Sequence, residues 1–167
     1  LHNGRSRDGR LLYPAFPYPS YSRLTVADMD ALYAYLRTVP AVTRANRPHA
    51  LRFPYGTQAA LAVWRALFFT PARFEPDPGR SAAWNRGRYL VDGLAHCAAC
   101  HSPRNALGGI GFDGELTGGP MPDAAWYAPS LTRADEAGLA DWPQADIVAL
   151  LQHGRAPRGA VSGPMAE

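Results

Sequence analysis

The stretch HCAACH at residues 96–101 contains both cysteines of the chain, Cys97 and Cys100, and is closed by His101. Two thiols at positions i and i+3 lie on one face of a helix, and the next side chain can turn its ring beneath a group that the thiols hold. Cys-x-x-Cys-His is the attachment signature of c-type haem, in which the thiols add across two vinyl groups and the imidazole binds the iron. The motif therefore predicts covalent haem c.

Two other chemistries use paired cysteines. A zinc knuckle needs four ligands, and because the chain has no second cysteine pair, the missing ligands would come from distant loops. A thioredoxin-like dithiol expects a strand before the motif and a βαβ context after it, which the pattern does not supply. Haem is favoured because long loops without secondary structure usually serve a site, and a buried porphyrin would give them a core.

The composition favours a folded chain and argues against a nucleic-acid partner and a membrane-spanning segment. The 167 residues amount to about one ordinary domain, or to a small domain and part of another, and 47% of them are hydrophobic. All 17 basic residues are scattered arginines, and a net charge of +3 is too weak to indicate a nucleic-acid partner. The longest apolar run, residues 59–69, is interrupted by Arg65 and is too short to cross a bilayer.

The two ends of the sequence lack the features of a complete polypeptide. The chain begins at Leu1 without an initiator methionine or a signal peptide, and it stops at Glu167 just after a Gly/Pro-rich loop. We therefore expect it to be an internal piece of a longer protein.

Helical periodicity predicts four helices separated by proline-rich segments. Thr25 would cap the first helix, with Asp28 as its capping-box carboxylate, and Gly154 would end the last. The expected helices cover residues 25–36, 57–69, 82–94 and 143–153.

The segments between the helices are predicted to be loops. Three prolines in residues 12–21 argue against a helix or a central strand there, residues 40–56 form a linker, and residues 102–130 are glycine-rich. We find no convincing strand pair. Gly87 lies inside the third helix, where glycine costs about 1 kcal/mol relative to alanine, so it predicts close approach of another helix.

Three motifs around the cysteines carry a family resemblance. RGRYLV at residues 86–91, CAACHSPRN at 97–105 and WYAPSLT at 126–132 resemble the second haem domain of the multihaem cytochrome c subunits of bacterial membrane-bound alcohol, aldehyde and gluconate dehydrogenases. These motifs are specific in combination, although each occurs across class I cytochromes c.

The beginning of the chain resembles the end of the first haem domain in the same proteins. SRDGR at residues 6–10 and YPAFPY at 13–18, followed by DALYAYL at 30–36, carry this similarity. The family has a methionine where this chain has Phe16, which cannot bind iron. A first haem would then be five-coordinate or would take its ligand from elsewhere, or Phe16 is simply an aromatic wall.

The resemblance implies an all-α fold. Residues 81–167 would form a class I cytochrome c-like helical domain around a covalent haem, with long loops and without its C-terminal helix. Residues 1–40 would be the C-terminal part of a preceding cytochrome c domain, and residues 41–80 a linker with one helix. The missing helix would dock on Gly87; in the alternative, the helix of residues 28–36 docks there.

The resemblance also assigns roles to individual residues. The two cysteines would carry the thioethers and His101 the bond to iron, while the Pro129 carbonyl would accept a hydrogen bond from the other imidazole nitrogen. Arg104 and Trp126 are candidate partners of the haem propionates, because guanidinium and indole N–H groups donate to carboxylates. Alternatively, they are an exposed arginine and a packed aromatic residue.

Three methionines are candidates for the sixth iron ligand. Met29 lies on the apolar face of a predicted helix and is assigned to the core. Met165 matches the family position, after the last helix and a loop, and is preferred over Met121. Ligation by a second histidine remains an open alternative.

Haem with two axial protein ligands has no open position and passes single electrons. The resemblance therefore implies a subunit that relays electrons from a dehydrogenase catalytic subunit to quinone or a terminal oxidase. It further implies the periplasmic side of the bacterial inner membrane, with membrane association through segments outside this chain. The alternative is a haem enzyme with an open iron site, either peroxidase-like or binding small ligands.

Overall fold

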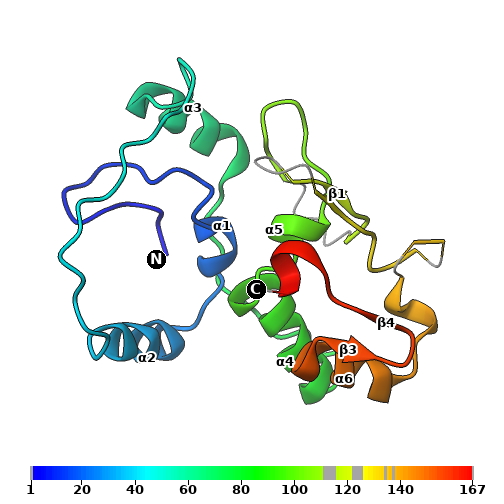
Figure 1. Ribbon diagram of the computed structural model, residues 1–167. Helices are drawn as coiled ribbons and strands as arrows, with labels where there is room; N and C mark the ends of the chain where they lie inside the picture. Colours follow the sequence, from blue (N-terminus) through cyan, green and yellow to red (C-terminus); the bar gives the residue numbers. More distant parts are fainter. Residues whose placement is uncertain (1, 111–115, 122–125, 134, 137, 167) are drawn as a thin grey trace. The chain divides into compact units, whose positions relative to one another are not determined.

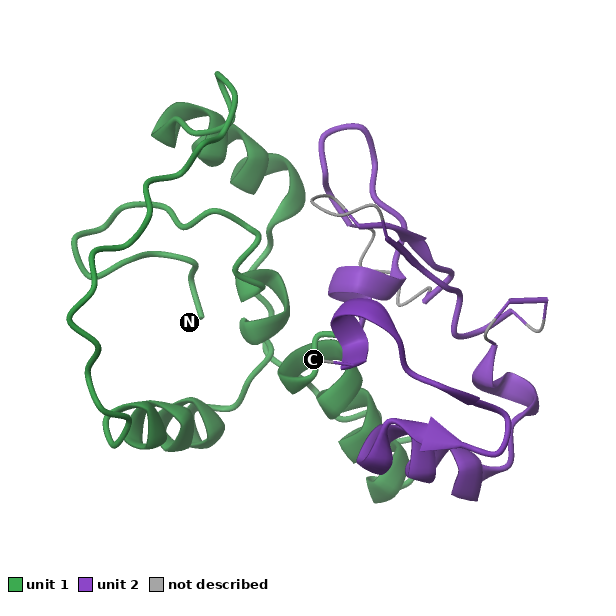
Figure 2. Cartoon of the chain, in the orientation of Figure 1, with its two compact units in different colours: residues 1–96 green, residues 97–167 purple. Residues whose placement is uncertain are grey.

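The computed structural model describes residues 2–110, 116–121, 126–133, 135–136 and 138–166. The chain forms two compact units, Leu1–His96 and Cys97–Glu167 (Figure 2). Both units are built mainly of helices and loops, as predicted. In the part of the chain that the structure describes, no helix is long and apolar enough to span a membrane.

Unit 1 contains the first three predicted helices and one further helical turn (Figure 1). The side-chain oxygens of Thr25, Thr57 and Ser81 each accept a hydrogen bond from the backbone N–H three residues later, so all three helices begin at polar caps. The elements are α1 (Tyr18–Tyr21), α2 (Val26–Leu36), α3 (Gln58–Phe68), α4 (Ala82–Tyr89) and the π-helical turn η1 (Leu90–Leu94).

The expectation of an extended loop over residues 12–21 is wrong at its end, because Tyr18–Tyr21 form the single turn α1. Pro19 lies in the first turn, where a missing backbone N–H breaks no helical hydrogen bond. Residues 40–52 have no regular secondary structure, as predicted for a loop, and they lead from α2 to α3 at opposite ends of the unit (Figure 1). The role of this segment as a linker between domains stays a prediction.

The core of unit 1 forms around Tyr18, which is fully buried. The Tyr18 ring makes an edge contact with Phe69, with ring centroids 4.9 Å apart, and the guanidinium carbon of Arg65 lies 5.1 Å and 4.6 Å from the two centroids. An added Cβ at Gly4 would approach the Tyr18 ring to 2.6 Å, so the N-terminal segment crosses this ring closely. Burial raises the pKa of Tyr18.

The space that a side chain at Gly87 would occupy is open. An added Cβ there would meet nothing within 4 Å, so the alternative in which the helix of residues 28–36 docks on this glycine is wrong. The start of α2 instead meets α4 through Tyr89, which hydrogen-bonds to Thr25 and Asp28.

Unit 2 contains the cysteine motif and the last predicted helix. That helix ends at Gly154, whose φ of 71° lies in the left-handed region that glycine favours. The elements are α5 (Ala98–His101), β1 (Gly119–Pro120), β2 (Tyr127–Ala128), η2 (Leu139–Asp141), α6 (Gln144–His153), β3 (Arg155–Ala156), β4 (Gly159–Ala160) and η3 (Gly163–Ala166).

The expectation that strand pairs are absent is wrong, although both ladders are short. Strands β1 and β2 are antiparallel, with Gly119 opposite Ala128, and β3 pairs in the same way with β4. The glycines and prolines of these segments concealed the pairing, because two-residue strands carry no alternating pattern.

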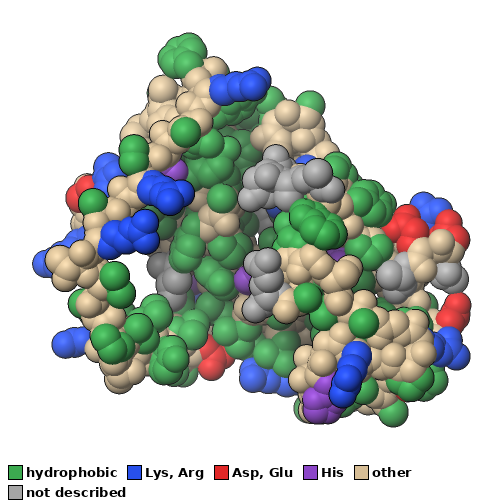
Figure 3. Space-filling model, viewed as in Figure 1, with side chains coloured by type: hydrophobic (Ala, Val, Ile, Leu, Met, Phe, Trp, Pro, Cys, Tyr) green, Lys and Arg blue, Asp and Glu red, His purple; other side chains and the backbone are tan. Residues whose placement is uncertain are grey.

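The described side chains of unit 2 form little apolar core of their own. Ala128 is the buried hydrophobic residue among them, and the other buried side chains are polar: His101, Ser102 and Ser130. Many large apolar residues of this unit are exposed, and hydrophobic side chains cover much of its visible face (Figure 3). They include Leu107, Trp126, Tyr127, Val148, Leu151 and Met165.

Candidate haem site

The cysteine motif is one turn of helix. The Cys97 carbonyl accepts hydrogen bonds from the backbone N–H groups of Cys100, at 3.2 Å, and of His101, at 2.9 Å. This turn places the two half-buried thiols on the same side of α5, and no disulfide joins them. The motif thus presents two sulfur atoms and an imidazole within a single turn.

The His101 imidazole is held by one defined hydrogen bond. The side chain is 9% exposed, and its Nδ1 lies 2.8 Å from the carbonyl oxygen of Pro129. Because a carbonyl oxygen can only accept, Nδ1 carries the proton, and in the neutral ring Nε2 keeps its lone pair. The Nε2 of His101 is therefore the ring nitrogen left with a lone pair, and the contact to Pro129 is the one that the family resemblance implies.

Two glycines bring the surrounding loop close to this turn. The Gly118 N–H donates to the His101 carbonyl at 2.7 Å, and its φ of +81° is left-handed. A Cβ on Gly118 would lie 2.6 Å from the Ser130 nitrogen, and one on Gly119 would lie 3.2 Å from the Pro103 Cα. The glycine-rich composition predicted a loop here, but it did not indicate these two positions.

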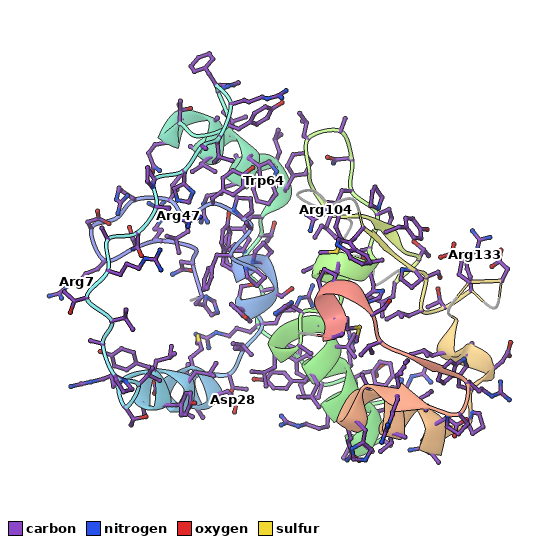
Figure 4. The ribbon with its side chains drawn as sticks, in the orientation of Figure 1. Arg7, Asp28, Arg47, Trp64, Arg104 and Arg133 are labelled. Atoms are coloured by element: carbon purple, nitrogen blue, oxygen red, sulfur yellow. The ribbon has the colours of Figure 1, made fainter. Side chains whose placement is uncertain are left out.

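Arg104 contacts the backbone of the motif. Its Nη2 donates to the Ala99 carbonyl, between the two cysteines, and its Nη1 donates to the Gly108 carbonyl at 3.3 Å. The residue is half-buried and lies beside α5 in Figure 4, so it is not the exposed arginine of the alternative interpretation. Its role toward a propionate stays a prediction.

Trp126 contacts the two segments that carry the candidate methionines. Its ring packs on the backbone at Gly163, where an added Cβ would approach to 2.8 Å, and Gly163 opens the short helix η3 that carries Met165. The Trp126 carbonyl also accepts the backbone N–H of Met121 at 3.0 Å. The Met165 side chain is 53% exposed and Met121 is half-buried, and the choice between them stays a prediction.

Phe16 makes an aromatic contact in unit 1. Its ring meets Tyr21 edge-on, with centroids 5.5 Å apart, while 39% of the residue is exposed. This packing fits the interpretation of Phe16 as an aromatic wall. The coordination of a first haem stays a prediction.

Sequence reasoning missed Glu136. Its Oε2 accepts the backbone N–H of Ser130 at 2.6 Å, and the Tyr127 hydroxyl lies 3.4 Å from both of its carboxylate oxygens. Ser130 is fully buried, and its hydroxyl accepts the N–H groups of Thr132 and Arg133. A single glutamate in a loop carries no motif or periodicity that would have marked it.

The donors and the burial pattern of unit 2 fit a covalently attached haem. Two thiols stand one turn apart, and the adjacent imidazole is fixed through Nδ1 with Nε2 left for a metal. The large apolar residues exposed in this unit would gain cover from a porphyrin, which has wide apolar faces. Among the described residues, no three His, Cys, Asp or Glu side chains are grouped to hold a metal by themselves, as a zinc site would require.

Comparison with known proteins also points to a protein with covalently attached haem. No protein-family model matches the chain. The chain is 43% identical over 166 residues to a subunit of the nicotinate dehydrogenase of Pseudomonas putida, and 39% identical over 173 residues to the fructose dehydrogenase cytochrome subunit of Gluconobacter japonicus. It is 40% identical over 175 residues to the cytochrome c subunit of the quinone-dependent alcohol dehydrogenase of Gluconacetobacter polyoxogenes.

These matches cover 99% or 100% of this chain. The chain spans 14%, 34% and 37% of the three relatives, respectively, so it corresponds to well under half of each. The chain is homologous along its length to c-type cytochrome polypeptides. More specifically, several of these relatives are named as cytochrome subunits of dehydrogenases, for fructose, alcohol and gluconate, which confirms the predicted resemblance to this class of subunit.

Proposed function

We propose that this chain carries a haem c on Cys97, Cys100 and His101 and acts as an electron-transfer segment of a dehydrogenase. The hydrogen bond from His101 Nδ1 to the Pro129 carbonyl is the main support, because it leaves Nε2 for the iron on the residue that directly follows Cys100. When bound, haem c supplies an iron that gains and loses one electron.

The residues of unit 2 would perform three tasks. The thiols of Cys97 and Cys100 would hold the haem as two thioethers, formed by addition of each S–H across a vinyl group, which would need no oxidant. Pro129 holds the imidazole in one tautomer, and Gly118 holds the end of α5 through the His101 carbonyl. Met165, or Met121 in the alternative, would close the iron to substrate as the sixth ligand.

The partners follow from the relatives. Fructose dehydrogenase and the quinone-dependent alcohol dehydrogenase each have a cytochrome subunit similar to this chain. We infer a dehydrogenase catalytic subunit as electron donor and quinone or a terminal oxidase as acceptor. The place of action would be the periplasmic side of the bacterial inner membrane, with membrane association through other segments.

The domain organisation of the resemblance is part of this proposal. Residues 81–167 would belong to the haem domain, residues 1–40 to the end of a preceding cytochrome c domain, and residues 41–80 to the linker. The relatives extend well beyond the matched region, which leaves room for further domains in such polypeptides.

Covalent haem attachment is the direct test. Protein produced in a host that matures c-type cytochromes should keep its haem through denaturing electrophoresis, as a haem stain reports. Replacing both Cys97 and Cys100 by alanine should remove the haem that this motif holds, whereas Ser102→Ala should keep it. Parent protein without covalent haem at this motif would refute the proposal.

The visible spectrum separates electron transfer from the open-site haem enzyme. Reduced protein with two axial ligands should show the same spectrum with and without carbon monoxide. An immediate shift of the haem bound by His101 would instead indicate an open coordination position.

A further inference from the structure

The peptide group between Pro129 and Ser130 is hydrogen-bonded at both ends. Its carbonyl oxygen accepts from His101 Nδ1 at 2.8 Å, and its N–H donates to Glu136 Oε2 at 2.6 Å. One peptide therefore connects an imidazole with a carboxylate that is far from it along the chain.

Such a connection changes the strength of both hydrogen bonds. A carboxylate that accepts from an N–H polarises the amide, so that its carbonyl oxygen becomes a better acceptor, by about 10–30% per bond. Bonds with an ionised partner are also stronger than neutral ones. When the Pro129 carbonyl accepts the Nδ1 proton more strongly, the imidazole gains electron density, and Nε2 becomes a stronger donor to a metal.

The surroundings keep this connection in place. Ser130 is fully buried. The hydroxyl of Tyr127, a residue of strand β2, makes a second, longer contact with the Glu136 carboxylate. The neighbouring cation, Arg133, pairs mainly with Asp135: its Nε and Nη2 lie 3.0 Å and 2.5 Å from the two carboxylate oxygens. It also interacts electrostatically with Glu136. Acidic and basic groups gather at this edge of unit 2, where Arg133 is labelled (Figures 3 and 4).

We propose that Glu136 is a positioning residue that tunes the haem through the Pro129–Ser130 peptide and His101, and that it lowers the reduction potential. A more electron-rich imidazole stabilises the oxidised iron more than the reduced iron. This inference rests on the proposed function, because it needs haem bound by His101.

The test is a redox titration of the complete haem-loaded protein with three single substitutions. Glu136→Gln keeps an acceptor for the Ser130 N–H but removes its charge, and Glu136→Asp keeps the charge but shortens the side chain away from that N–H. Asp135→Asn is the control for losing one nearby negative charge, since Asp135 bonds to Arg133 and not to the peptide.

In Glu136→Gln we expect the ratio of reduced to oxidised haem at a given potential to rise about two- to fourfold, from the loss of peptide polarisation. That ratio corresponds to a potential about 18–36 mV higher, at 59 mV per tenfold change for one electron. Glu136→Asp should also raise the potential although its charge is kept, and Asp135→Asn should raise it less than Glu136→Gln.

The outcomes separate this inference from the proposed function. The proposed tuning by Glu136 is overturned if the potential of Glu136→Gln shifts no more than that of Asp135→Asn, or if the potential of Glu136→Asp does not shift. Either result leaves the electron-transfer role untouched. Parent protein without haem on Cys97 and Cys100 overturns the proposed function itself.

Discussion

The hydroxyl of Tyr89 donates a 2.5 Å hydrogen bond to the carboxylate of Asp28, 61 residues away in the sequence. The same hydroxyl accepts the backbone N–H of Thr25 at 3.1 Å, while the Thr25 hydroxyl accepts the Asp28 N–H at 3.1 Å. Tyr89 of α4 therefore takes part in the hydrogen bonds that cap the start of α2. Asp28, labelled in Figure 4, thereby couples the start of one helix to the end of another.

Replacing Tyr89 by phenylalanine should loosen α2. The substitution keeps the ring contact with Phe74 but removes both hydrogen bonds of the hydroxyl, and we expect the free energy of unfolding to fall by about 1–2 kcal/mol. Urea unfolding followed by circular dichroism measures this loss. Tyr33→Phe is the control, since Tyr33 is 62% exposed; equal stability of the two variants would contradict the role of the Tyr89 hydroxyl.

The same contact makes stability depend on acidity. The hydrogen bond from Tyr89 lowers the pKa of Asp28 below its ordinary value of 3.8, so the unfolded chain binds this proton more readily than the folded one. The stabilising effect is complete above that value and is lost as the pH falls through the lower folded pKa. Urea midpoints measured from about pH 6 to about pH 2.5 should therefore fall less steeply in Asp28→Asn than in the parent protein. Parallel curves would show that Asp28 contributes nothing.

Alanine at Gly118 should damage the site. The backbone there has φ of +81° and an added Cβ would lie 2.6 Å from the Ser130 nitrogen, so a methyl group displaces the peptide that holds His101. We expect a loss of about 2–4 kcal/mol in the free energy of unfolding and reduced haem content.

Gly108→Ala is the matched control for Gly118→Ala. Gly108 has φ of +75° with nothing within 4 Å of an added Cβ, so only backbone strain of about 1–2 kcal/mol applies. Similar losses in the two variants would show that the close approach at Gly118 is unimportant.

Removing the preferred sixth ligand should change both potential and reactivity. We expect Met165→Ala to lower the reduction potential of the haem on His101 and to let carbon monoxide bind the reduced iron, because a thioether favours the reduced state. Redox titration and visible spectra measure the two effects. Met121→Ala is the comparison, and an unchanged potential in Met165→Ala with a lowered one in Met121→Ala would reassign the ligand.

Gly87 provides a test of the proposed domain organisation. Because nothing lies within 4 Å of an added Cβ, Gly87→Ala should stabilise α4 in residues 1–167 by about 1 kcal/mol. In a polypeptide that carries the C-terminal helix of the resemblance, the same substitution should destabilise, since the methyl group would separate two docked helices. Thermal unfolding of both proteins measures the sign, and stabilisation in both would argue against docking at Gly87.

The local features of the chain, namely the helix ends and the cysteine motif, were determined by the amino-acid sequence alone. Helix starts at Thr25, Thr57 and Ser81 and the stop at Gly154 depend on contacts three or four residues apart, so residue type and spacing are enough to find them. The cysteine motif is likewise a single helical turn whose spacing carries its chemistry. The contact of His101 with Pro129 was accessible only because three motifs together resemble a known family.

Folding in three dimensions decided the remaining contacts. Glu136 meets the Pro129–Ser130 peptide, and Arg104 meets the Ala99 carbonyl, through the path of loops that have no period in the sequence. Tyr89 reaches Asp28 because two helices distant along the chain are brought together. Hydrogen bonds between side chains and backbone groups can be made by many residue types at many separations along the chain. Their partners are therefore known only from the folded structure.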